Sequence, residues 1–244
     1  MSLNSLPNEI LHEIACLTGS DVKNLRLVNK LVNGAADPVM WDIHPIILDL
    51  NWDHVALGMS MLDNLSNSSD EKIRKLVIKS LNPSKDPPLY DLAPNKPDNA
   101  EAVAEACRRL PDILPRALSA LKGLKSARWE LARRESERIL DAVLESLGPL
   151  PALVDFEITI VDDTRGDNAP DAALPLQHLR NGALQRLAIK HDNIPDLNQF
   201  VSSVATVLLH NPRIIHLELD MFAYGWQREQ LSFQDLIQDL PSET

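Results

Sequence analysis

The stretch Leu153-Val-Asp-Phe156-Glu-Ile158 carries the pattern that decides the fold. Its apolar residues stand at the first, fourth and sixth positions, with other residues between them. In an extended strand, side chains two residues apart point to the same face, so Phe156 and Ile158 share one side of the strand. The residues between and beside them point to the other side. The segment therefore predicts a strand with one buried face and one polar face.

The same pattern occurs six times along the chain. Its occurrences are Ile43/Ile46/Leu48, Ile73/Leu76/Ile78, Leu124/Ala127/Trp129, Leu153/Phe156/Ile158, Leu184/Leu187/Ile189 and Ile214/Leu217/Leu219. Several such triplets arise by chance in an ordinary globular composition, so their spacing matters more than their number. Successive triplets begin 30, 51, 29, 31 and 30 residues apart. A nearly constant step of about 30 residues is typical of a repeat protein.

Amphipathic segments lie between the predicted strands. Apolar spacing predicts helices over 52–65, over 136–147 and from Pro195 to Asn211, and a weak helical signal over 172–179. A further helix begins near Pro97, and we expect Pro111 and Pro115 to interrupt it. Strands that alternate with helices at one step predict an α/β fold, with a parallel sheet and helices packed on one face.

This organisation resembles a leucine-rich-repeat array with long, helix-bearing repeats. The family usually carries Asn or Cys after the triplet. Here that position holds Asn only at Asn51, and the other five residues are Leu81, Ala132, Val161, Asp192 and Phe222. The resemblance implies stacked strand–helix units and does not extend to the family's regular ladder of side-chain hydrogen bonds. The aromatic residues Phe222, Tyr224 and Trp226, with Met221, and a helix over 230–240 are expected to cap the end of the array.

Two amphipathic helical segments precede the repeats. Pro7 suits the first position of a helix, where its missing N–H costs nothing, and Glu9 complements the helix dipole. An apolar stripe then follows at helical spacing and ends at Thr18-Gly19. Its members are Ile10, Ile14 and Leu17, with Leu6 leading in and Leu11 beside them.

The second helical segment is expected to place Val22, Leu25 and Val28 on one face, which Leu27, Leu31 and Val32 widen. Residues 6–41 are too few to bury this much apolar surface among themselves. Either the rest of the chain or a partner must cover the surplus.

The order and spacing of these residues resemble an F-box. The matching positions are Leu6-Pro7-x-Glu9-Ile10-x-x-x-Ile14, then Leu25-Arg26-x-Val28-x-Lys30, then Pro38 and Trp41. An F-box is a short helical module that docks onto the Skp-type adaptor of cullin–RING ubiquitin ligases. The resemblance implies an F-box module over 1–42, a leucine-rich-repeat-like solenoid over 43–226 and a capping helix and tail over 227–244. It also implies an adaptor-binding set made of Leu6, Pro7, Glu9, Ile10, Ile14, Val22, Leu25 and Val28.

The outward face of the predicted sheet alternates between basic and acidic strands. Its residues are Lys75, Val77 and Lys79; Ser126, Arg128 and Glu130; Asp155, Glu157 and Thr159; Arg186, Ala188 and Lys190; and His216, Glu218 and Asp220. Alternating charges can simply solvate a strand face, or they can form a docking strip for a protein substrate. The substrate-binding candidates are Lys75, Arg128, Asp155, Glu157, Arg186, His216 and Glu218.

Composition narrows the class of protein. The net charge of −11 argues against generic binding to nucleic acid or to an anionic membrane. The sequence shows no signal peptide and no apolar run long enough to cross a bilayer, and two cysteines favour a reducing compartment, the cytoplasm or the nucleus. We find no phosphate-binding, metal-ligand or nucleophile motif, so neither an enzyme nor a cofactor or metal is expected.

These patterns favour a substrate receptor of a Skp–cullin–F-box ubiquitin ligase. Two alternatives remain at the level of the sequence. One is a repeat scaffold unrelated to ubiquitin, whose N-terminal helices cap its own first strand. The other is an enzyme, which would need a bound metal or cofactor for which the sequence offers no site.

Overall fold

The computed structural model describes residues 6–25, 27–67, 71–83, 99–132, 135–161, 174–191 and 197–221. The predicted aromatic residues at 222–226 and the predicted helix over 230–240 lie outside these ranges. No helix in the described ranges is both long enough and apolar enough to cross a bilayer.

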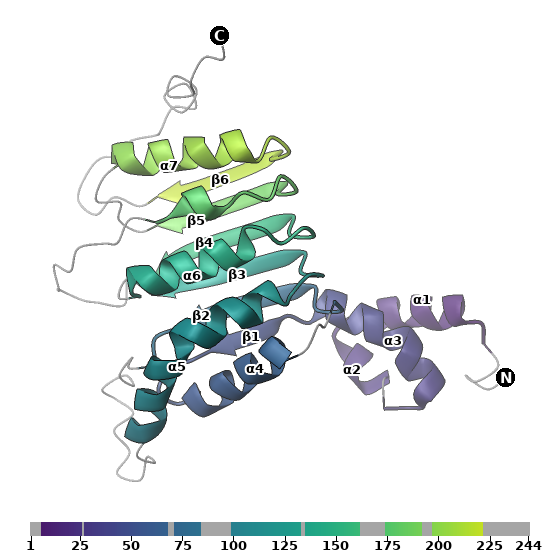
Figure 1. Ribbon diagram of the computed structural model, residues 1–244. Coiled ribbons are helices and arrows are strands. Elements are labelled where there is room, and N and C mark those ends of the chain that lie inside the picture. Colours follow the sequence, from purple (N-terminus) through teal and green to yellow (C-terminus); the bar gives the residue numbers. More distant parts are fainter. Residues whose placement is uncertain are drawn as a thin grey trace.

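One parallel sheet of six strands organises the described chain (Figure 1). The strands are β1 (Ile46–Asp49), β2 (Lys75–Ser80), β3 (Ser126–Ala132), β4 (Asp155–Val161), β5 (Arg186–His191) and β6 (His216–Met221). They lie side by side in sequence order, so each strand pairs with its neighbours along the chain. Each strand contains the last two residues of one predicted triplet, which confirms the six-strand parallel sheet.

The strand register follows the triplets. Ile46, Leu76, Ala127, Phe156, Leu187 and Leu217 form one row of paired residues across the sheet. Leu48, Ile78, Trp129, Ile158, Ile189 and Leu219 form a second row. Both rows belong to the main hydrophobic core or pack against it. The apolar residues therefore set which face of the sheet is buried.

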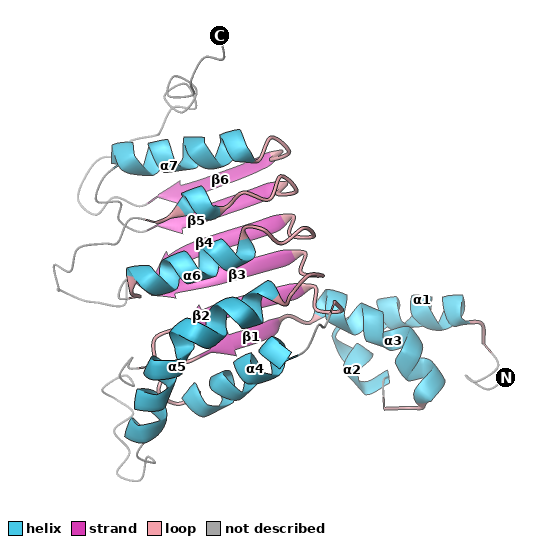
Figure 2. Ribbon diagram, in the orientation of Figure 1, coloured by secondary structure: helices cyan, strands magenta, loops and turns pink. Residues whose placement is uncertain are grey.

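Helices cover that apolar face of the sheet (Figure 2). They are α4 (Val55–Asn67), α5 (Ala100–Ser119), α6 (Glu137–Leu147), the short 3₁₀ helix η4 (Leu176–His178) and α7 (Leu197–His210). Their main helix–helix contacts run between consecutive elements, α4 with α5, α5 with α6, α6 with η4 and η4 with α7. The α/β arrangement of the prediction is confirmed, and within the described ranges no helix lies on the opposite face of the sheet.

Helix α5 corrects one prediction. It passes through Pro111 and Pro115 without a break, although each proline removes a backbone hydrogen bond. The part of α5 that contains the prolines buries Leu110, Ile113 and Leu114, and Ala117 and Leu118 after it are also buried. Burial of this apolar face outweighs the lost hydrogen bonds, so the helix continues to Ser119.

The N-terminal module consists of α1 (Asn8–Thr18), the 3₁₀ turn η2 (Gly19–Asp21), the single turn α2 (Val22–Leu25) and α3 (Lys30–Ile43). Pro7 is the N-cap of α1, one position before the predicted one, and its carbonyl accepts from the Leu11 N–H. Gly19 ends α1 with a φ of 54°, a conformation that glycine adopts without strain.

The predicted helix from Val22 to Val32 is wrong. Asn29 has an extended backbone, and its side chain accepts a 2.9 Å hydrogen bond from the Val32 N–H. This is an N-cap, which starts α3 as a separate helix at Lys30. Val28 therefore lies in the turn between α2 and α3 and does not share a helical face with Val22.

The module has a small core of its own and a narrow attachment to the sheet. Ala15, Val22, Ala36 and Val39 form that core. Trp41, near the end of α3, packs against the main core instead. Two ion pairs flank the junction, Asp37 with Lys72 at 3.3 Å and Asp42 with Lys125 at 3.6 Å. The module projects from the end of the sheet where the strands begin (Figure 1).

Two asparagines link the turns that precede the last strands. Asn181 donates to the carbonyls of Leu150 and Leu153 and accepts from the N–H groups of Ala183 and Leu184. Asn211, which is 1% exposed, donates to Leu179 and Val207 and accepts from the N–H groups of Asn181 and Gly182. Each side chain therefore connects its own turn to the turn before the preceding strand.

We expect Asn211→Ala to lower the free energy of unfolding by about 2–4 kcal/mol, because the Leu179 carbonyl and its neighbours lose a buried partner. Urea denaturation followed by circular dichroism measures the change. Asn24→Ala, at an exposed position of α2, is the control and should change it by less than about 0.5 kcal/mol. Equal effects of the two substitutions would contradict a structural role for the Asn211 side chain.

Candidate functional site

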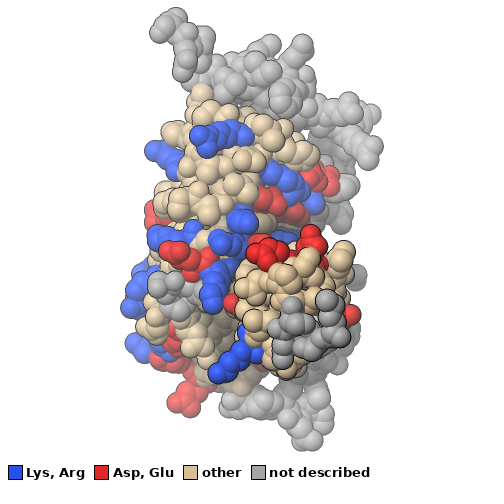
Figure 3. Space-filling model, turned by 90° about the vertical axis from the view of Figure 1, so that its right-hand side faces the viewer, with Lys and Arg blue, Asp and Glu red and all other residues tan. Residues whose placement is uncertain are grey.

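The N-terminal module carries a cluster of exposed large apolar side chains. We call Ile10, Leu17, Leu27, Val28 and Leu31 the apolar surface of the module; their exposed fractions are 41%, 87%, 84%, 53% and 43%. Uncharged residues make up most of the module's visible surface where it projects toward the viewer in Figure 3. Five large apolar side chains left exposed on so small a module make it a candidate binding surface.

Local packing explains why these residues are exposed. Helix α1 turns Leu11 and Ala15 inward, and Ala15 meets Val22, Ala36 and Val39 in the module core. Because a helix has 3.6 residues per turn, Ile10 and Leu17 are left on the outer side. Leu27 and Val28 lie in the turn that Asn29 closes, and this turn has no helical face to bury them.

The predicted adaptor-binding residues divide into three groups. Pro7, Glu9, Ile10 and Val28 are exposed, whereas Leu6, Ile14 and Leu25 are partly buried. Val22 is 0% exposed and belongs to the core of the module, so it is corrected from a contact residue to a packing residue. Leu17, Leu27 and Leu31 were absent from the predicted set, although their apolar spacing in the sequence could have included them.

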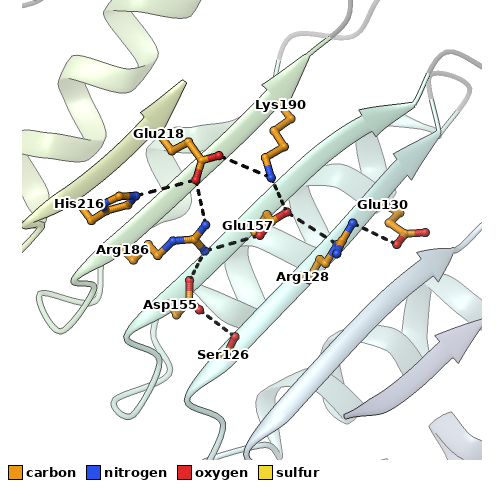
Figure 4. Close-up of polar contacts among 9 residues, drawn as sticks. All are labelled: Ser126, Arg128, Glu130, Asp155, Glu157, Arg186, Lys190, His216 and Glu218. Atoms are coloured by element: carbon orange, nitrogen blue, oxygen red, sulfur yellow. Dashed lines mark hydrogen bonds and ion pairs between the residues drawn. The ribbon is translucent and has the colours of Figure 1, made fainter. Parts of the chain in front are cut away.

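The outward face of the sheet forms a second candidate surface. On β3–β6, nine side chains make a connected set of polar contacts that we call the ion-pair network (Figure 4). Its members are Ser126, Arg128, Glu130, Asp155, Glu157, Arg186, Lys190, His216 and Glu218. Because the strand register places residues of opposite charge on adjacent strands, the predicted alternation of charge becomes direct pairing.

Arg186 is the centre of the ion-pair network. Its guanidinium lies 2.9 Å from Asp155, 3.5 Å from Glu157 and 3.0 Å from Glu218. Lys190 lies 3.1 Å from Glu157 and 3.6 Å from Glu218. Two cations on β5 therefore neutralise carboxylates of both neighbouring strands. Ala188, expected to be outward-facing, is between them on β5 and is fully buried.

The edges of the network are more loosely held. Arg128 lies 3.6 Å from Glu130 and 3.8 Å from Glu157, and His216 lies 3.9 Å from Glu218. Ser126 donates to Asp155 at 3.2 Å. Six of the seven predicted substrate-binding residues belong to the network. Lys75 does not, because it lies on β2, beyond these contacts.

Pairing shifts the pKa values of three members. The hydrogen bond to Asp155 raises the pKa of Arg186, and the hydrogen bond to Glu157 raises the pKa of Lys190. The hydrogen bond from Arg186, with the nearby charge of Lys190, lowers the pKa of Glu218. All three shifts favour the charged forms of Arg186, Lys190 and Glu218.

The described residues include no group of three or more His, Cys, Asp or Glu side chains arranged to hold a metal ion. The two surfaces offer apolar contact on the module and charged contact on the sheet. No known protein-family model matches the chain, and no curated protein matches it either.

We expect Glu218→Gln to destabilise the protein at pH 7 and at pH 5, and to lose this effect as the pH falls toward 3. The pKa of Glu218 is lowered in the folded state, so its carboxylate stabilises the fold above the unfolded pKa of about 4.3. That contribution disappears as the pH falls through the folded pKa. Denaturant titrations of both proteins across this pH range measure the difference.

Asp220→Asn is the matched control for this titration. Asp220 is exposed two residues further along β6, and no ion pair joins it to another residue of the described chain. Its substitution should have little effect at any of these pH values. A Glu218→Gln difference that stays constant down to pH 3 would contradict the ionic origin of the stabilisation.

Proposed function

We propose that this protein is an F-box substrate receptor of a Skp–cullin–F-box ubiquitin ligase. The N-terminal module binds the Skp-type adaptor, and the repeat region, a leucine-rich-repeat-like solenoid, binds a protein substrate. The observation that carries the proposal is the apolar surface of the module, because its five large side chains remain exposed in the folded chain. The F-box-like spacing at Leu6, Pro7, Ile10 and Ile14 identifies the class of partner.

The way in which the module is attached also favours a receptor over a self-capped scaffold. Helices α1 and α2 make their main contacts with α3 and with each other. Among the described residues of the module, Trp41 at the end of α3 is the one that packs against the main core. If the module served to cap the first strand, its apolar side chains would be expected to cover β1. Instead, they face away from the module core and are accessible to a partner.

In this proposal the protein contributes proximity and no bond chemistry. Holding a substrate near an activated ubiquitin raises the effective concentration of the reacting groups, so no catalytic residue is required in the receptor. The two surfaces lie on different parts of the molecule, the module and the outward face of the sheet. Adaptor and substrate can therefore bind at the same time.

We expect Ile10→Ala and Leu6→Ala each to weaken adaptor binding by on the order of 2 kcal/mol, about 30-fold in Kd, because each removes an apolar anchor from the interface. Titration calorimetry of the full chain with a purified Skp-type adaptor measures this. Leu57→Ala and Leu209→Ala are controls, since they remove exposed apolar groups on α4 and α7, outside the module.

Unchanged affinity after substitution of both Leu6 and Ile10 would reject the receptor function. A chain that is monomeric and fully soluble alone, with no affinity for the adaptor, would support the scaffold alternative instead.

A further inference from the structure

The outward face of the sheet is divided into two unlike parts. On β3–β6, three cations, Arg128, Arg186 and Lys190, stand among five carboxylates, those of Glu130, Asp155, Glu157, Glu218 and Asp220. On β1 and β2 we call Ile47, Lys75, Val77 and Lys79 the β1–β2 patch. The patch combines two cations with two apolar residues. The one carboxylate of these two strands is that of Asp49, the last residue of β1. It accepts from the backbone N–H of Asn51 at 3.2 Å and lies 3.7 Å from His54.

Among the residues that the structure describes, no carboxylate pairs with either lysine of the patch. Both lysines are exposed. The polar groups next to them on β3 have other partners. Ser126, which pairs in register with Lys75, donates its hydroxyl to Asp155. Glu130 lies 3.6 Å from Arg128. The cations of β2 are therefore available to a ligand.

The apolar centre of the patch is accessible as well. Ile47 is 46% exposed, and its register partner on β2 is Val77, which is partly exposed. Val77 stands between Lys75 and Lys79 on the same strand. Arg128, 50% exposed, is the register partner of Val77 on the other side. The patch thus presents an apolar centre flanked by positive charges, on a chain whose net charge is −11.

We propose that the β1–β2 patch binds a short, extended, acidic segment of a protein substrate. Lys75 and Lys79 are four residues apart on one strand, about 13 Å at 3.3 Å per residue. An extended peptide has the same repeat, so two carboxylates four residues apart match the two lysines, and an apolar residue midway contacts Ile47 and Val77. The role of the patch as a substrate site rests on the proposed receptor function.

The ion-pair network on β3–β6 limits which other ligands can bind the β1–β2 patch. A nucleic acid or an anionic membrane would extend beyond the patch and meet the excess of carboxylates on β3–β6, which repels it. A short acidic segment confined to β1 and β2 avoids this repulsion. Three of these carboxylates, those of Asp155, Glu157 and Glu218, are already paired with Arg186 or Lys190, so a long basic segment gains little from them.

Selection of random ten-residue peptides on the full-length chain, without adaptor, tests the proposal. We expect enriched peptides to carry two Asp or Glu residues four apart with a large apolar residue between them. Lys75→Glu/Lys79→Glu should weaken binding of these peptides at least tenfold, and higher salt should weaken binding to the unmodified chain. Lys122→Glu/Arg213→Glu makes the same change of net charge at exposed positions in the turns before β3 and β6 and should change Kd less than twofold.

Three results would overturn the proposal: no enrichment, enrichment of basic or uncharged peptides, or acidic peptides that bind the Lys75/Lys79 variant as well as the unmodified chain. Anionic vesicles or single-stranded DNA that bind with the same dependence on Lys75 and Lys79, in the absence of peptide binding, would also overturn it. Adaptor titration of the Lys75/Lys79 variant should be unchanged, so a failure of the receptor function is recognised separately from a failure of the patch.

Discussion

The structure depends on the parallel register of six strands, in which two rows of apolar side chains are buried beneath the helices. The rows fit by size as well as by polarity, since Phe156 pairs in register with Ala127, and Trp129, which is fully buried, with Ile158. A shift of one residue would move the apolar residues of a strand to the outward face and its charges into the core. The same register brings Arg186 to three carboxylates, so the ion-pair network on the outward face is a consequence of how the core packs.

The sequence predicted this register because its signal is local and repeated. A triplet with period two, recurring at a step near 30 residues, determines which side of each strand is buried. The errors arise where tertiary contacts or a single side-chain hydrogen bond decide the outcome. Helix α5 continues through Pro111 and Pro115 because its apolar face is buried, and Asn29 separates α2 from α3 through one cap. Neither effect is visible in apolar spacing alone.

The candidate surfaces were predictable to different extents. Apolar spacing identifies which residues of a short helical module are hydrophobic, but it does not determine which of them form its core. Val22 and Leu17 have similar sequence signals, yet one is fully buried and the other almost fully exposed. On the sheet, strand alternation predicted the outward charged residues but not the burial of Ala188 between Arg186 and Lys190. Strand alternation does not predict which charges pair, because pairing depends on how far a side chain reaches across to the neighbouring strand. It therefore did not distinguish Arg186 and Lys190 of β5, which are paired with carboxylates, from Lys75 and Lys79 of β2, which have no ion pair among the described residues.

The asparagine contacts constrain the two ends of the six-strand sheet unequally. Local opening of a protein begins where the structure is least constrained. Asn181 and Asn211 join the turns before β5 and β6 to the turns that precede them, whereas β1 has four residues and follows directly on Pro45. Amide hydrogens of β4 and β5 should therefore exchange most slowly with solvent, and those of β1 fastest. The sheet accordingly opens most readily at its β1 edge, next to the N-terminal module.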